Sequence, residues 1–190
     1  MNHPVTINNP AIFVVAVLAI VIAAFYAHLY SRRRHSDMLR RRFGPEYDRV
    51  VGQEQSVTRA ENVLEFRQKA RKAIQLRSLV PGDRLAFVSR WNDIQQQFSD
   101  EPCEAVLGAD LLINDLMEAR GYPIDNFEQR WELISVDHPV LVQNYRAAHD
   151  VAMRQKSGHV TAEDLRKAMI HYRSLFDELL RESAADRQQA

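Results

Sequence analysis

Residues 11–30 have the sequence AIFVVAVLAIVIAAFYAHLY, which carries no formal charge and is followed almost at once by Arg32, Arg33 and Arg34. At about 1.5 Å of rise per residue, a helix of this length is roughly 30 Å long, which matches the hydrocarbon core of a bilayer. We therefore expect these residues to cross a membrane once as a helix. The rest of the chain is then held against one face of that membrane.

A cleaved signal peptide is the main alternative interpretation of this stretch. Signal peptides have a basic start, a shorter apolar core and small residues at the cleavage site. The first ten residues, MNHPVTINNP, contain neither Lys nor Arg, and the apolar run is longer than a signal peptide requires. A retained membrane anchor is the better interpretation.

Basic residues next to the span predict its orientation. The segment RRRHSDMLRRR supplies six arginines just after the apolar run, and none precede it. Because Lys and Arg are retained on the cytoplasmic side, we expect the N-terminus outside and the C-terminal domain in the cytoplasm. Basic residues near a membrane surface also attract anionic lipid headgroups, by about 1 kcal/mol each. The predicted lipid-facing basic cluster is Arg32, Arg33, Arg34, Arg40, Arg41 and Arg42.

Charge is distributed unevenly along the chain. Residues 1–80 hold thirteen Lys or Arg and six Asp or Glu, whereas residues 81–190 hold twelve and nineteen. The acidic distal part argues against nucleic-acid binding, which normally needs a basic surface. The single cysteine, Cys103, excludes an internal disulfide.

The chain after the span predicts helices throughout, because no alternating strand pattern, hairpin signal or repeat occurs. We predict an all-α fold: a single N-terminal transmembrane helix, a basic neck and stalk helix, and a compact bundle of about five helices. The expected segments are an outer tail (1–10), the transmembrane helix (11–30), the juxtamembrane neck and stalk (31–80), the bundle (81–182) and a tail that frays (183–190).

The predicted stalk helix, residues 56–77, contains no Gly or Pro and carries a narrow apolar stripe. The stripe consists of Val63, Phe66, Ala70, Ala73 and Ile74. Spacings of three and four residues place these side chains on one face. The stripe fits packing on one partner helix, either within the chain or on a second copy. A solvated arm that lies along the domain is the alternative.

Within the bundle, the pattern favours Trp91 as a core residue and residues 99–121 as a central helix. Asp110 and Asn114 share one face of that helix, and we favour a stripe exposed to solvent over polar partners in the core. Asp125 is expected to cap the next helix. Thr161 and Asp164 resemble a capping box that opens the last helix.

No motif points to catalysis. The sequence has no HExxH motif, no paired ExxH motif and no phosphate-binding glycine-rich loop. We therefore assign no catalytic residue, cofactor or metal ligand. The residues considered for a small pocket are Tyr122, His138, Tyr145, His149 and His171. The preferred interpretation is structural, with these polar groups capping helices and tying the bundle together.

Several strings of the sequence resemble a family of short, uncharacterised bacterial membrane proteins with one N-terminal transmembrane helix and a helical C-terminal domain. They are RHSDMLRRRFGPEYDRVV, ARGYPIDNFEQR, SVDHP, NYRAAH and TAEDLRKAMIHYRSLFDELL. The resemblance covers most of residues 34–180. It implies a single-pass protein of the bacterial inner or plasma membrane, and it brings no known activity, cofactor or catalytic residue.

These observations favour a binding role over catalysis. The first hypothesis is a membrane-anchored cytoplasmic helical module, a scaffold that binds protein in its own oligomer or in a partner complex. The alternative is a small-ligand-binding or hydrolytic helical domain whose pocket is lined by His and Tyr. The expected partners are the membrane with its anionic headgroups and a protein, and not nucleic acid.

Overall fold

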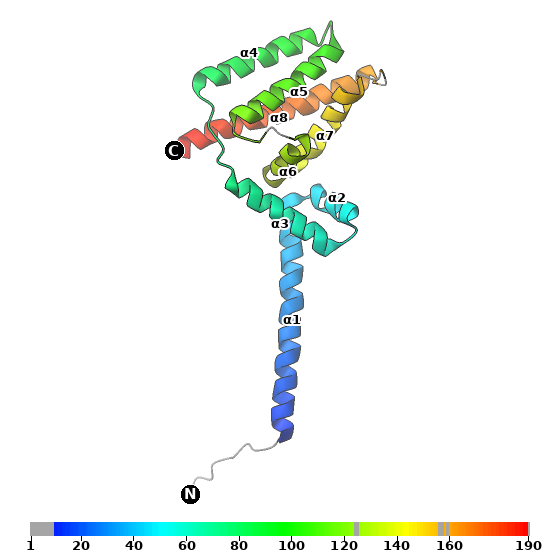
Figure 1. The fold of residues 1–190 in the computed structure, drawn as a ribbon, viewed down its shortest axis with the longest axis vertical. Helices are drawn as coiled ribbons and strands as arrows, with labels where there is room; N and C mark the ends of the chain where they lie inside the picture. Colours follow the sequence, from blue (N-terminus) through cyan, green and yellow to red (C-terminus); the bar gives the residue numbers. More distant parts are fainter. Residues whose placement is uncertain (1–9, 124–125, 156–157, 159, 190) are drawn as a thin grey trace.

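The computed structural model describes residues 10–123, 126–155, 158 and 160–189, and all regular secondary structure in this part is helical (Figure 1). The predicted all-α fold, with one long apolar N-terminal helix followed by a helical bundle, is confirmed. The helices are α1 (Pro10–Phe43), α2 (Pro45–Glu54), α3 (Val57–Ala73), α4 (Pro81–Gln97), α5 (Pro102–Ala119), α6 (Phe127–Asp137), α7 (Pro139–Arg154) and α8 (Ala162–Gln189).

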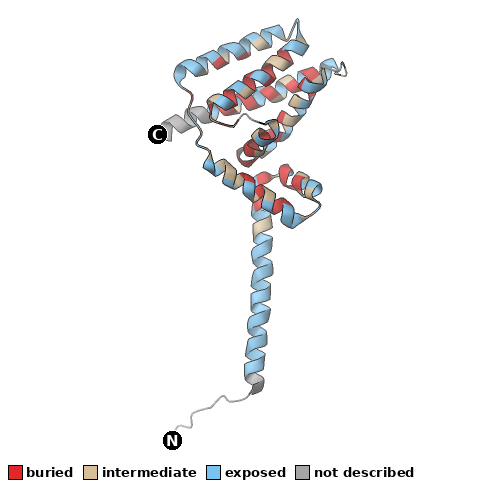
Figure 2. Cartoon of the chain, in the orientation of Figure 1, coloured by how far each residue is buried: buried red, intermediate tan, exposed pale blue. Residues whose placement is uncertain are grey.

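Helix α1 runs without interruption from the apolar stretch into the domain. Its 34 residues correspond to a length of about 50 Å. Residues 13–31 are all exposed in the described chain (Figure 2). One helix of the described structure is therefore long and apolar enough to cross a membrane. At its other end, Leu39 and Phe43 are fully buried.

The end of α1 is held in a small core of its own. Gly44, with φ of 50°, allows the chain to turn sharply, and Pro45 opens α2 at a position where proline fits. Helices α2 and α3 then fold back beside the end of α1. The apolar residues of this core are Leu39, Phe43, Tyr47, Val50, Ala60, Leu64 and Val136. Val136 belongs to α6, so this core also reaches the distal bundle.

A larger core lies among α4, α5, α6, α7 and α8, the five helices that follow residue 80. Helix α5 packs against α4, α7 and α8, and Figure 1 shows it between α4 and α8. Its buried apolar side chains are Val106, Leu112, Ile113, Leu116 and Met117. Trp91 stacks on Phe176 with ring centroids 4.9 Å apart. The predicted core role of Trp91 is therefore confirmed.

Helix ends follow local sequence signals closely, with two differences. The capping box is present: Thr161 Oγ1 accepts from the Asp164 backbone N–H at 3.2 Å, and Asp164 accepts from the Thr161 N–H at 3.1 Å. Helix α6 is capped by Asn126, which accepts from the Glu128 N–H at 2.8 Å. The predicted cap, Asp125, lies outside the described residues. Helix α8 continues to Gln189, through the tail that was expected to fray.

The expected stripe on the stalk helix does not form the buried face of α3. Ala60, Leu64 and Arg67 point inwards, whereas Phe66 is 70% exposed. Val63, Ala70 and Ile74 are only partly buried. The pattern missed the inward face because that face includes Arg67, a charged residue that hydropathy assigns to solvent. The extended residues 74–80 then lead to α4, where we expected the bundle to begin.

Replacing Leu39 by alanine tests the docking of α1. Leu39 is fully buried, so Leu39→Ala should lower the free energy of unfolding of the full-length protein by about 2–4 kcal/mol, through lost burial and a residual cavity. Met38 is 55% exposed on the same helix, and Met38→Ala should change stability by less than about 0.5 kcal/mol. Chemical unfolding in detergent measures both. Equal losses for the two variants would contradict the docking of α1.

Candidate functional site

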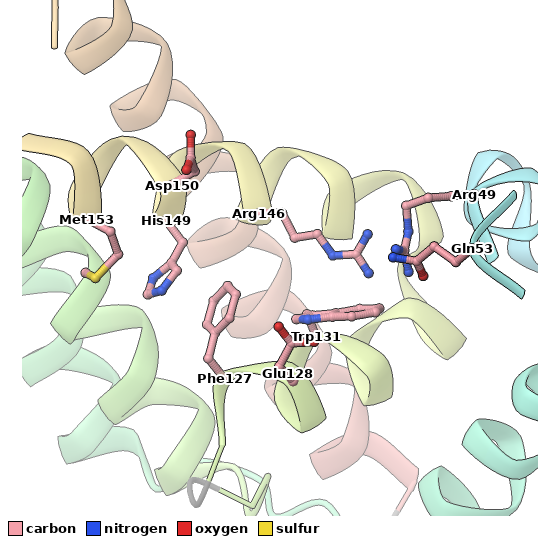
Figure 3. Close-up of a pocket in the computed structure, with 9 residues that line it drawn as sticks. All are labelled: Arg49, Gln53, Phe127, Glu128, Trp131, Arg146, His149, Asp150 and Met153. Carbon is pink, nitrogen blue, oxygen red and sulfur yellow. The ribbon is translucent and has the colours of Figure 1, made fainter. Parts of the chain in front are cut away.

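A cleft of about 450 Å³ opens between α2, α6 and α7 (Figure 3). Its walls combine basic, aromatic and acidic side chains. The residues that line it are Arg49, Gln53, Phe127, Glu128, Trp131, Arg146, His149, Asp150 and Met153. Some of these side chains belong to two buried polar networks, one around Glu46 and one around Asp110.

The first network joins three arginines to a single buried carboxylate. Glu46 on α2 has no exposed surface. Arg49, one turn away, donates to it at 2.6 and 2.8 Å. Arg67 of α3 donates at 2.9 Å, and Arg146 of α7 donates at 3.1 and 3.2 Å. One carboxylate therefore connects α2, α3 and α7.

The same arginines surround the indole ring of Trp131 on α6. The guanidinium carbon of Arg146 lies 3.2 Å from the ring centroid, and those of Arg67 and Arg49 lie at 4.6 and 4.8 Å. Figure 3 shows the guanidinium groups of Arg146 and Arg49 above this ring. The electron-rich face of an aromatic ring attracts cations. Trp131 thus helps to stabilise the cluster of positive charge around Glu46.

The protonation states follow from these contacts. Burial raises the pKa of Glu46, but the hydrogen bond from Arg49 and the charges of Arg146 and Arg49 lower it by more, so the pKa lies below its ordinary value. Glu46 is therefore ionised at neutral pH. Burial lowers the pKa of Arg146, and the Glu46 charge opposes this shift. An arginine nevertheless remains protonated in the physiological range.

The second network is organised by Asp110 on α5, which is 4% exposed. Its Oδ1 atom accepts from the Tyr172 hydroxyl at 2.8 Å and lies 2.9 Å from His149 Nδ1. One turn further along α5, Asn114 Oδ1 accepts from the Tyr145 hydroxyl at 3.1 Å and from Arg130 at 2.8 Å. The expected solvent stripe is therefore wrong for Asp110. Partners on α7 and α8 satisfy the buried carboxylate, and local periodicity does not reveal them.

His149 connects the second network to the cleft. The Asp110 carboxylate favours the tautomer that carries its proton on Nδ1, and in the neutral form of that tautomer Nε2 is the acceptor. Phe127 stacks on the imidazole with ring centroids 3.7 Å apart. A histidine oriented by a carboxylate is the arrangement of a general base. However, a general base of this kind commonly activates a Ser, Thr or Cys nucleophile. No Ser, Thr or Cys is among the described residues that line this cleft.

The buried tyrosines of this network stay protonated. Burial, followed by the charge of Asp110, raises the pKa of Tyr145 and of Tyr172 well above the ordinary value for a phenol. Both hydroxyls therefore act as hydrogen-bond donors, to Asn114 and Asp110 respectively. Their role is to tie α7 and α8 to α5.

Only part of the predicted His and Tyr pocket comes together. Tyr145 and His149 meet beside Asp110 and Asn114, and of the five predicted residues only His149 lines the cleft. The other three have different surroundings. Tyr122 is buried after α5, and the Arg71 guanidinium lies over its ring. His138 lies between α6 and α7, with its Nδ1 atom 3.4 Å from Glu178. His171 is half-buried on α8, and burial lowers its pKa.

The predicted basic cluster divides into two groups along α1. Eight residues separate the start of one triad from the start of the next, which corresponds to about 12 Å on a continuous helix. Arg40 pairs with Asp48 of α2 at 3.1 Å, and its guanidinium lies over the Tyr47 ring. Arg40 thus contributes to the contact between α1 and α2. Residues 32–34 lie nearest to the end of the apolar stretch.

No protein-family model matches the chain, and searches of curated proteins and of solved structures found no match either. The resemblance to short bacterial membrane proteins therefore stays a prediction. Within the described residues, no group of three or more His, Cys, Asp or Glu side chains is placed to hold a metal ion.

Replacing Glu46 by glutamine tests the first network. The change keeps the shape of the side chain but removes the charge that three arginines share, so it should lower the free energy of unfolding by about 3–5 kcal/mol at neutral pH. The folded pKa lies below the ordinary value of 4.5, so this stabilisation is complete above that value and is lost as the pH falls through the folded pKa. Chemical unfolding over the acid range should show the difference from wild type shrinking.

Glu128→Gln is the matched control for this measurement, because Glu128 is exposed at the rim of the same cleft. It should change stability by less than about 0.5 kcal/mol. Similar losses in both variants would show that Glu46 is not the shared counter-ion.

Proposed function

We propose that the chain is a single-pass protein of the bacterial inner or plasma membrane, with its helical domain on the cytoplasmic side. The apolar half of α1 supports a membrane span, because its residues 13–30 are all exposed in the described chain. The arginines that follow the apolar stretch support the orientation. They lie at the end of α1 from which the domain emerges (Figure 1).

Reporter fusions test this topology. A reporter fused after Ala190 should be active only as a cytoplasmic protein, and a reporter at Met1 should be exported. The six arginines of the basic cluster determine the orientation. Replacing them with glutamine should therefore yield a mixture of orientations. An exported C-terminus in the unmodified protein would contradict the proposed address.

We infer that the domain acts by binding protein, and one observation carries this inference: an apolar groove between α3 and α6 remains open. The groove has a volume of about 430 Å³, and Phe66, 70% exposed, stands at its edge. Its other apolar lining residues are Ala70, Ala73, Ile74, Pro123 and Leu133, and the polar ones are Arg67, Gln129 and Glu132. Burying exposed apolar surface of this kind favours association. We call this surface the α3–α6 groove.

The partner proposed for the α3–α6 groove is a second copy of the chain. The groove contains both a projecting ring, Phe66, and small residues, Ala70 and Ala73, so one patch supplies a knob and a hole. Self-complementarity of this kind is what a two-fold interface requires. Two anchored copies also present the groove at the same height above the membrane. No residue of α1 lines the groove, so α1 does not form one of its walls.

The alternative, a small-ligand-binding or hydrolytic pocket, has weaker support. The Asp110–His149 pair favours it, because the histidine lines a cleft. Against it, both terminal nitrogens of Arg146 already donate to Glu46, so an anionic ligand would have to compete with a buried carboxylate for them. Tyr122, His138 and His171 also do not line this cleft.

Cysteine cross-linking tests self-association. If Phe66 of one copy fits against Ala73 of the other, Ala70 of both copies lies near the two-fold axis. Ala70→Cys, in a chain whose native Cys103 is replaced by serine, should therefore form a disulfide-linked dimer in membranes. Adding Phe66→Glu should reduce this dimer several-fold, because it would bury an unpaired charge.

Leu85 supplies the matched control, because it is also 70% exposed but lies on α4, away from the groove. Leu85→Cys should not cross-link, and Leu85→Glu should leave the Ala70→Cys dimer unchanged. Equal cross-linking at both positions, or none at Ala70, would overturn the proposed dimer.

A further inference from the structure

A second cleft, of about 430 Å³, lies where α3 meets α1. We call it the α1–α3 cleft. Its α1 wall consists of Leu29, Arg32, Arg33, Ser36 and Asp37, and its α3 wall consists of Val57, Thr58 and Glu61. Each α1 residue lies three or four positions from another member of the wall, so the five share one face of the helix.

Contacts between the two helices place this cleft at the end of the apolar stretch. Arg32 donates to Thr58 Oγ1 at 3.1 Å, and His35 lies 2.8 Å from Glu65. The first turns of α3 therefore lie beside the first polar turns of α1. In a membrane-anchored chain this is the level of the lipid headgroups. Val57 adds a half-exposed apolar side chain at the same end of α3.

The chemistry of the α1 wall changes in a fixed order along the helix axis. Leu29 is apolar, Arg32 and Arg33 follow about 5–6 Å further on, and Asp37 follows another 6 Å or more beyond them. Glu61 of α3 adds a second carboxylate to the cleft, and its Oε1 atom accepts from the Tyr47 hydroxyl at 3.1 Å. From the membrane outwards the cleft is thus apolar, then cationic, then anionic.

We propose that the α1–α3 cleft binds the headgroup of a phospholipid that carries both a phosphate and a primary amine, as phosphatidylethanolamine does. Acyl chains lie against Leu29 and the apolar turns before it. The phosphate lies between Arg32 and Arg33, and the ammonium group donates to Asp37 and Glu61. This inference rests on the proposed membrane anchoring. The proposed site selects a headgroup that carries both a negative and a positive charge. This differs from the general attraction of the arginines to an anionic membrane surface.

The sequence of cationic and then anionic side chains along the cleft favours phosphatidylethanolamine over two other common phospholipids. Phosphatidylglycerol offers a phosphate but no cation, so its outer end would meet two carboxylates without compensating them. Phosphatidylcholine carries the same charges, but its quaternary amine has no N–H to donate. A charge-assisted hydrogen bond contributes enough to change affinity about tenfold.

Native mass spectrometry of the full-length protein in detergent provides the test, with an equal mixture of the three lipids bearing identical acyl chains. The phosphatidylethanolamine adduct should exceed each of the others by about tenfold. Asp37→Asn should reduce this preference to about twofold or less, since one of two acceptors is lost. Arg33→Gln should weaken all three adducts together, because each lipid carries the phosphate.

Asp93→Asn is the matched control, because Asp93 is also exposed but lies on α4, remote from the cleft. It should leave the lipid preference unchanged. A preference for phosphatidylglycerol, or a preference unaffected by Asp37→Asn, would overturn the proposed site. Alkaline extraction of native membranes separates this failure from failure of the anchor: a protein that stays in the membrane but does not select the amine contradicts the headgroup site alone.

Discussion

The buried carboxylate of Glu46 is the interaction on which the arrangement of the domain depends. Its three arginine partners come from α2, α3 and α7, and Arg146 lies 100 residues further along the chain. Removing a carboxylate from water is favourable only when its partners surround it. Burial of Glu46 therefore requires α2, α3 and α7 to be packed together. Apolar contacts alone tolerate sliding, whereas hydrogen bonds from planar guanidinium groups fix the register of each helix.

This network joins α1, the proposed membrane anchor, to the distal bundle. Helices α2 and α3 pack on the end of α1 through Leu39 and Phe43, and they reach α6 and α7 through Glu46 and Arg67. Arg71 adds an ion pair with Asp137 at the end of α6. The direction of the apolar span is thereby linked to the surfaces of the domain. The α3–α6 groove and the α1–α3 cleft consequently have defined positions with respect to the apolar half of α1.

Local sequence signals predicted the helices, but they could not predict ion pairs and hydrogen bonds between residues far apart in the sequence. The capping box at Thr161 and the absence of any alternating strand pattern can be recognised from a few neighbouring residues, so the all-α fold could be predicted. Glu46 and Arg67 lie 21 residues apart and leave no periodic trace. A hydropathy pattern assigns such charges to solvent, which is why the inward face of α3 and the burial of Asp110 were missed. Tyr145 and His149 could be paired in advance because four residues place them on one helix face.

The cleft between α2, α6 and α7 and the α3–α6 groove differ in which existing contacts a ligand would have to displace. In the cleft between α2, α6 and α7, Arg146 and His149 are already engaged with the carboxylates Glu46 and Asp110. An incoming anion would gain contacts to Arg146 only by weakening contacts that hold the fold together. At the α3–α6 groove, Phe66 is exposed to water, so covering it buries apolar surface without breaking a hydrogen bond of its side chain. Covering the groove is therefore less costly than filling the cleft, and this difference favours the proposed binding role over the proposed pocket.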